Sequence, residues 1–147
     1  MTNGNKNANE IILQNVYQGA RMGTDAIAKL MPKVKNEKFK QAMATQLNGY
    51  QTFMSDACTK LTAMNKTPED VSIIQKIPSE FGMIRGTAMD KSDSKIAEMM
   101  INGSVMGIAE IKKSVAGKSG VPEDTMKLAQ DVITFEENNI NNMKSFL

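Results

Sequence analysis

The chain of 147 residues contains no histidine and no tryptophan, and Cys58 is its single cysteine. The absence of histidine removes the imidazole that many transition-metal sites and many general-base catalysts use. A lone cysteine excludes an internal disulfide and fits a reducing compartment. No segment approaches the ~18 uninterrupted apolar residues that are needed to span a bilayer. These absences favour a bacterial-type cytoplasmic protein without a membrane partner.

An excess of charge of one sign is also lacking. The 18 Lys and Arg residues are nearly balanced by 16 Asp and Glu residues, which gives a net charge of +2. The two signs are interspersed, and no basic stripe is interleaved with aromatic residues as in many nucleic-acid-binding surfaces. We therefore expect no nucleic-acid partner. The length and the hydrophobic content of 41% fit a single globular domain over residues 1–147.

Residues that interrupt helices are few, with only four prolines and ten glycines. Apolar residues recur at three-four spacing, which is typical of amphipathic helices, in windows of about 8–31, 35–65, 92–115 and 122–147. At 1.5 Å per residue these helices would each be about 36–46 Å long. No run shows the alternation expected of a strand. The predicted fold class is all-α, with four helices of similar length.

The connections between these windows differ greatly in length. Short turns near 32–34 and 116–121 predict two antiparallel hairpins, at about 8–65 and 92–147. The remaining connection, about 66–91, is long enough to run the length of a bundle, since an extended chain covers ~3.3 Å per residue. We expect a short helix within it after Pro78. The alternative is an unbroken helix over 79–115.

A short sequence word occurs twice at a fixed distance. Gln18–Gly23 reads QGARMG, Asn102–Gly107 reads NGSVMG, and the two glycines of each word are separated from their counterparts by 84 residues. The repeat predicts two similar hairpins related by an approximate two-fold axis. Aligning the second helix of each hairpin with an offset of 90 residues places Gln46 opposite Glu136.

The segment Ile96–Ile101, followed by Gly103–Ile108, resembles the ferritin-like superfamily, and in particular its small bacterial ferritin-like domains. The resemblance covers about residues 8–147. It implies a ferritin-like four-helix bundle made of two antiparallel hairpins joined by a long crossover. In di-iron members of the superfamily, one helix of each hairpin gives a Glu and the other gives Glu-x-x-His.

Carried onto this sequence, the resemblance implies a degenerate di-iron site. The four carboxylate positions are occupied by Gln14, Gln46, Glu98 and Glu136, and the two imidazole positions by Gly49 and Asn139. One interpretation is a buried polar layer, flanked by Tyr17 and Tyr50, whose side chains hydrogen-bond across the bundle. The other is one weakly bound divalent metal held by Glu98 and Glu136, with Gln14, Gln46 and Asn139 as further candidate ligands.

Among these residues, Glu136 is assigned to the buried face of its helix most clearly, because it lies within the apolar stripe of the last window. Burial of a lone carboxylate is costly unless it is hydrogen-bonded, paired or protonated. The sequence offers two kinds of partner: the polar side chains of Gln46, Asn139, Tyr50 and Tyr17, and the cationic side chains of Arg21 and Arg85.

Three functional hypotheses follow. The first is a non-catalytic ferritin-like bundle without a cofactor or catalytic residues, acting as a structural or interaction protein and forming a homodimer. The second is a metal-binding protein that retains a carboxylate site at Glu98 and Glu136. The third is a binder of a small apolar ligand in a cavity lined by some of the 13 methionines.

Overall fold

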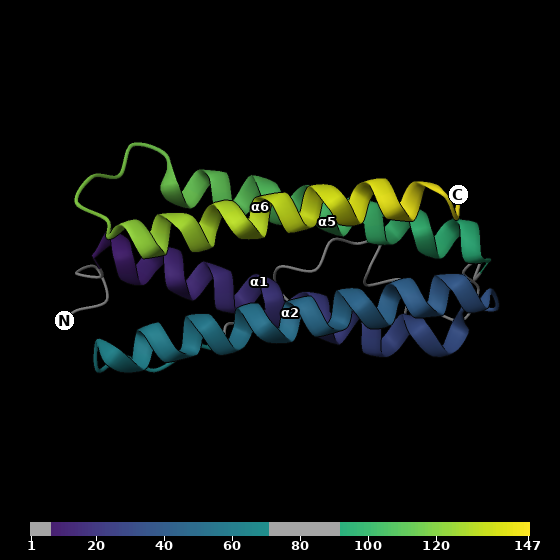
Figure 1. The fold of residues 1–147 in the computed structure, drawn as a ribbon, viewed down its shortest axis with the longest axis horizontal. Helices are drawn as coiled ribbons and strands as arrows, with labels where there is room; N and C mark the ends of the chain where they lie inside the picture. The colour runs from purple at the N-terminus through teal and green to yellow at the C-terminus, as the bar shows by residue number, and fades with distance from the viewer. Residues whose placement is uncertain (1–6, 71–91) are drawn as a thin grey trace.

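The computed structural model describes residues 7–70 and 92–147. In this part of the chain the structure consists of four α-helices and one 3-10 turn, without strands (Figure 1). The elements are α1 (Ala8–Leu30), η2 (Met31–Lys33), α2 (Glu37–Ala63), α5 (Asp93–Val115) and α6 (Glu123–Lys144). The all-α prediction is confirmed. Among these elements, none has the length and apolar character of a transmembrane helix. The short helix expected after Pro78 lies outside the described residues.

Side chains at the helix ends explain the boundaries. The carbonyl oxygens of the Asn7 and Asn36 side chains and the hydroxyl of Ser92 accept the N–H of the residue three positions later, at the starts of α1, α2 and α5. α2 ends where Asn65 takes a left-handed conformation, with φ of 58°, and the Lys66 N–H then donates to the Leu61 carbonyl. The end of each predicted window lies within a few residues of the end of the corresponding helix.

The helices form two antiparallel pairs, α1 with α2 and α5 with α6, and α1 also packs against α5. α2 ends at one end of the bundle, whereas α5 begins at the opposite end and runs in the same direction as α2 (Figure 1). The carboxylate of Asp93 fixes the start of α5 beside the α1–α2 turn, because it accepts the N–H groups of Lys35 and Asn36, both at 2.9 Å.

The core runs the length of the bundle in two hydrophobic clusters. The 84-residue repeat is visible in it, since buried positions of α1 recur as buried positions of α5. In α1 these are Leu13, Val16, Ala20, Ile27 and Leu30, and in α5 Ala97, Met100, Ser104, Ile111 and Ser114. Met106, the methionine of the second repeated word, is exposed, because the buried face of α5 passes through Ser104 and Gly107.

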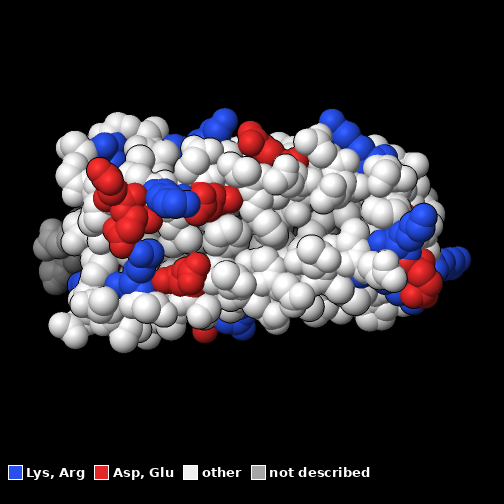
Figure 2. All heavy atoms as spheres, in the orientation of Figure 1, with Lys and Arg blue, Asp and Glu red and all other residues white. Residues whose placement is uncertain are grey.

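Charge is unevenly distributed over the face formed by α2 and α6. Lys, Arg, Asp and Glu side chains gather toward the two ends of this face and along its upper edge, and the part between them carries no charge (Figure 2). The exposed residues of α2 in this middle part are uncharged, namely Gln41, Ala44, Thr45, Asn48, Gln51 and Thr52.

Candidate functional site

The candidate site is a hydrogen-bonded cluster around one buried carboxylate at the centre of the bundle. Glu136 of α6 is buried, and Tyr50 of α2 donates its hydroxyl to it, 2.8 Å from Oε1 and 3.0 Å from Oε2. Ser104 Oγ of α5 donates to Oε1 at 2.8 Å, and Asn139 Nδ2 donates to the same oxygen at 3.1 Å. Three helices therefore supply three neutral donors to a single carboxylate.

The second glycine of each repeated word makes room for this cluster. A methyl group on Gly23 would lie 2.5 Å from Cζ of Tyr50, and one on Gly107 would lie 3.1 Å from Oε2 of Glu136. Glycine in a helix interior costs roughly 1 kcal/mol relative to alanine. The close contact with Tyr50 explains the glycine at position 23, whereas a methyl group at position 107 would require only a small shift of the Glu136 carboxylate.

The same contacts give the correspondence between the two hairpins. Tyr50 lies against Gly23 in one hairpin, and Glu136 lies against Gly107 in the other. Tyr50 and Glu136 are separated by 86 residues, so the contacts relate the second helices by 86 residues rather than by the 90 expected from the sequence. Tyr50 and Glu136 thus occupy equivalent positions in the two helix pairs, and they hydrogen-bond to each other at the bundle centre.

Burial and hydrogen bonding act in opposite directions on Glu136. Burial raises the pKa of its carboxyl group above the usual range, while the donors Ser104, Tyr50 and Asn139 partly offset this increase. The pKa of Tyr50 is raised well above its ordinary value, first by burial and then by the charge of Glu136. Tyr50 therefore keeps its proton and acts as a donor.

Gln46 lies one helical turn before Tyr50 on α2 and is also buried. Among residues 7–70 and 92–147, neither its amide nitrogen nor its amide oxygen has a hydrogen-bond partner. Buried amides without partners are rare, because each unsatisfied group costs about 1–3 kcal/mol. Gln46 is thus in the interior, as expected, but it does not join the hydrogen-bonded cluster.

Gln14 is buried for a different reason than expected. Its amide nitrogen donates to the Thr67 carbonyl at 2.9 Å, and its amide oxygen accepts the Glu69 N–H at 2.8 Å. Gln14 is covered by the chain that follows α2, and it does not lie in the interior of the bundle. The prediction that Gln14 joins a central polar layer is therefore wrong.

Gln14 belongs to a row of polar residues on α1 that holds the start of the long connection. Gln18 donates to the Glu69 carbonyl at 3.4 Å, and Arg21 pairs with Asp70 at 2.7 Å. Arg21 therefore does not neutralise Glu136, and Arg85 lies outside the described residues. Tyr17, another expected partner, packs against the second hydrophobic cluster instead.

Glu98 does not point into the bundle. Its side chain is 54% exposed and pairs with Lys95 at 3.3 Å. The buried face of α5 passes through Ala97 and Met100, so Glu98 lies on the outer side. The expected inward orientation of Glu98 is therefore wrong. The polar residue that α5 contributes to the Glu136 cluster is Ser104, which the sequence did not predict. The signal for Ser104 was its position 84 residues after Ala20, a buried residue of α1.

The two positions that the resemblance assigns to imidazoles have structural roles. A methyl group on Gly49 would lie 2.2 Å from an edge carbon of the Phe135 ring, so the aromatic ring packs directly on the α2 backbone. Asn139 is buried and donates to Glu136, which confirms the expected pairing of these two residues.

The described residues do not fit the di-metal centre of the superfamily's di-iron members. They contain no group of three or more Asp, Glu or Cys side chains close enough to hold a metal ion. Of the four carboxylate positions, only Glu136 brings a carboxylate to the bundle centre, and hydroxyl and amide hydrogens already point at it.

No family model, no curated protein and no solved structure matches the chain.

Replacing Gln46 with methionine tests whether its amide is unsatisfied. The volume changes little while the unpaired polar atoms disappear, so we expect the free energy of unfolding in urea to rise by about 1–2 kcal/mol. Gln14→Met is the matched control. It removes two hydrogen bonds and is expected to lower the same free energy by a similar amount. A destabilised Gln46→Met variant would show that the Gln46 amide has a bound partner.

Proposed function

We propose that the chain is a non-catalytic ferritin-like four-helix bundle that acts as a structural or interaction protein. The observation that carries the proposal is the cluster around Glu136. Its carboxylate receives hydrogen bonds from Tyr50, Ser104 and Asn139, all neutral donors from the same chain. Such a cluster specifies how three helices align, which is the best-attested role of buried polar groups.

The arrangement of the helices supports the ferritin-like part of the proposal. Two antiparallel pairs, with α2 and α5 running in the same direction, need a connection that returns along the bundle. This feature distinguishes ferritin-like bundles from up-down-up-down bundles. The alternative of a residual metal site at Glu98 and Glu136 has less support, because these side chains lie on the outside and in the interior of the bundle, respectively.

The proposal predicts that the protein neither retains metal stoichiometrically nor accelerates Fe(II) oxidation. Protein purified without chelator should contain iron, manganese and zinc at well below one equivalent by elemental analysis. Anaerobic addition of Fe(II) followed by air should give a ferric absorbance that grows no faster than in buffer.

Glu136→Gln is the control for this experiment, since it removes the central carboxylate while keeping its shape. The proposal requires wild type and variant to behave alike in both assays. Stoichiometric metal in the wild type that is lost in Glu136→Gln would replace the proposal with a metal-binding function.

A further inference from the structure

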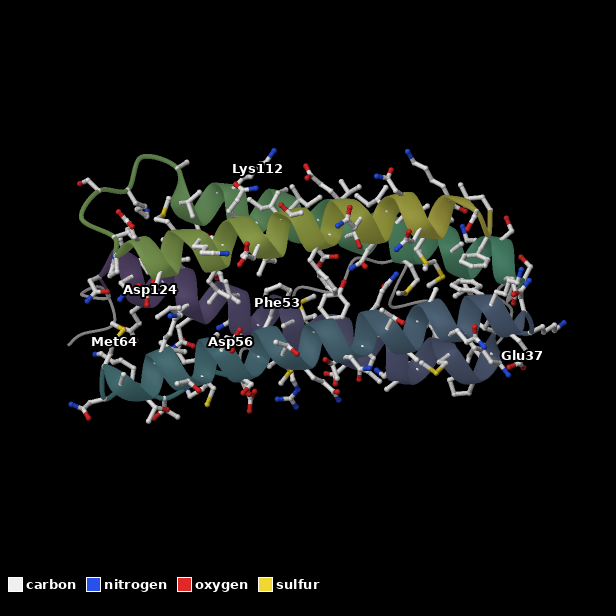
Figure 3. All side chains as sticks on the ribbon, in the orientation of Figure 1. Glu37, Phe53, Asp56, Met64, Lys112 and Asp124 are labelled. Atoms are coloured by element: carbon white, nitrogen blue, oxygen red, sulfur yellow. The ribbon has the colours of Figure 1, made fainter. Side chains whose placement is uncertain are left out.

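The face formed by α2 and α6 has the features of a surface that binds a copy of itself. A seam of two half-buried aromatic rings lies at its centre, where Phe53 of α2 packs on Phe135 of α6 with ring centroids 5.2 Å apart. Figure 3 shows Phe53 directed from α2 into this seam. Exposed uncharged side chains flank the seam, namely Gln41, Thr45, Asn48 and Thr52 on α2 and Asn138 and Asn142 on α6.

Two unpaired charges of opposite sign delimit this uncharged stretch on α2. Lys38 and Asp56 are both exposed, and among the described residues neither has an ion-pair partner. They are 18 residues apart, which is five full turns, so both point to the same side of α2 at a separation of about 27 Å. Near Asp56 the surface is hollowed by a cleft of about 370 Å³, lined by Lys60, Asp124 and Asp131 among others.

We propose that a second copy of this chain docks on the α2–α6 face, antiparallel and related by a two-fold axis near the middle of α2. This inference rests on the proposed interaction function and names its partner. In this arrangement Lys38 of each copy faces Asp56 of the other, and the uncharged centre meets itself without like-charge repulsion. A two-fold interface is self-complementary, so one pair of residues forms the contact twice.

The size of the face suits such a contact. Two neighbouring helices about 30 Å long and about 20 Å wide present about 600 Å² before side-chain relief is counted. Stable interfaces bury about 800 Å² per partner. On the α1–α5 side the described residues are less suited to such a contact, because the chain after α2 covers part of α1 and the Arg21–Asp70 ion pair lies there.

Sedimentation velocity tests the interface. The wild type is expected to sediment with twice the chain mass of 16.1 kDa. Thr45 and Thr52 lie next to the proposed axis, so the double variant Thr45→Glu/Thr52→Glu brings like charges together across it. We expect this variant to raise the dissociation constant of the dimer about tenfold or more. The matched control, Ala28→Glu/Ala109→Glu, adds the same charge on exposed positions of α1 and α5 and should leave the dimer unchanged.

A charge exchange tests the antiparallel orientation. Lys38→Glu alone places a carboxylate opposite Asp56 twice per dimer and should weaken it about tenfold, whereas Lys38→Glu/Asp56→Lys should restore the wild-type affinity. Equal helical circular dichroism in all variants would show that folding is retained.

Each outcome decides the inference. A wild type that is monomeric at 100 µM, or a Thr45→Glu/Thr52→Glu variant that dimerises as tightly as the control, would overturn it. Failure of the exchanged pair to restore affinity would overturn the antiparallel arrangement. None of these results affects the non-catalytic function, which the metal assays test separately.

Discussion

Replacing Glu136 with alanine is expected to lower the free energy of unfolding by about 4 kcal/mol. Truncation leaves the donors of Tyr50, Ser104 and Asn139 without their acceptor, and buried unsatisfied groups cost about 1–3 kcal/mol each. It also opens a cavity in a core that relaxes only partly. Urea unfolding followed by circular dichroism measures the change. A loss below about 1 kcal/mol would show that the cluster does not hold the helices in place.

Glu136→Gln separates the shape of this side chain from its charge. We expect a change within about 1 kcal/mol of wild type at pH 7, because the amide oxygen still accepts hydrogen bonds from the same donors. A strong destabilisation would instead indicate that a cation holds the carboxylate.

The two proteins should also differ in their response to pH. The pKa of Glu136 is raised in the folded state, so the folded protein binds this proton more tightly than the unfolded chain does. The contribution of this group to stability is therefore fully present below the unfolded pKa of about 4.3 and is lost as pH rises through the folded pKa. Glu136→Gln should remove this decrease. An identical pH dependence in both proteins would show that Glu136 does not titrate differently on folding.

The sequence located the central carboxylate because its position in α6 was unambiguous. Glu136 stands three or four residues from buried neighbours on both sides, Ile133 and Asn139 among them. The helical periodicity therefore places its side chain on the buried face of α6 and on no other. Tyr50 and Asn139 could also be named as its partners, since Asn139 lies one turn away on the same helix and Tyr50 has a long side chain. Ser104 was missed because a serine in a helix gives no signal of its own unless the 84-residue repeat is extended to every core position.

Glu98 could not be placed from the sequence alone. α5 carries apolar residues around much of its circumference, including exposed Val105 and Met106, so the periodicity does not fix its buried face. The repeat does relate Gln14 to Glu98. Gln14 is nevertheless buried only because residues 67–69 pass over it, and the side chain of Glu98 lies in solvent. Burial by a distant segment is a tertiary effect that helical periodicity does not contain.

The offset between the second helices was wrong by about one turn for a related reason. The 90-residue offset placed Glu136 opposite Gln46, whereas the contacts match Glu136 with Tyr50. A shift of four residues keeps every side chain near the same helical face, so a sequence alignment cannot distinguish the two registers. Only the glycine contacts between helices decide between them.

Replacing Gly23 with alanine is expected to lower the free energy of unfolding by about 3 kcal/mol, even though alanine is the better helix former. The added methyl group would lie 2.5–2.7 Å from three atoms of the Tyr50 ring, which is much closer than van der Waals contact. Tyr50 is held between the α1 backbone and Glu136, so its ring cannot retreat without moving its hydroxyl away from the carboxylate. Overpacking typically costs 1–3 kcal/mol, and a weakened hydrogen bond to a charged group adds about 1.5 kcal/mol or more.

Gly19→Ala is the matched control for this substitution, on the same helix and one turn earlier. Its new methyl group would have no atom within 4 Å, so only helix propensity changes, and we expect a gain of about 0.5–1 kcal/mol. The double variant Gly23→Ala/Tyr50→Phe tests the coupling, because a ring without a hydroxyl can shift freely. Its loss should be smaller than the sum of the two single losses by at least 0.5 kcal/mol. Equal effects of Gly19→Ala and Gly23→Ala on urea unfolding would contradict the close packing of Tyr50 on α1, and with it the role of the repeated glycines in forming the central cluster.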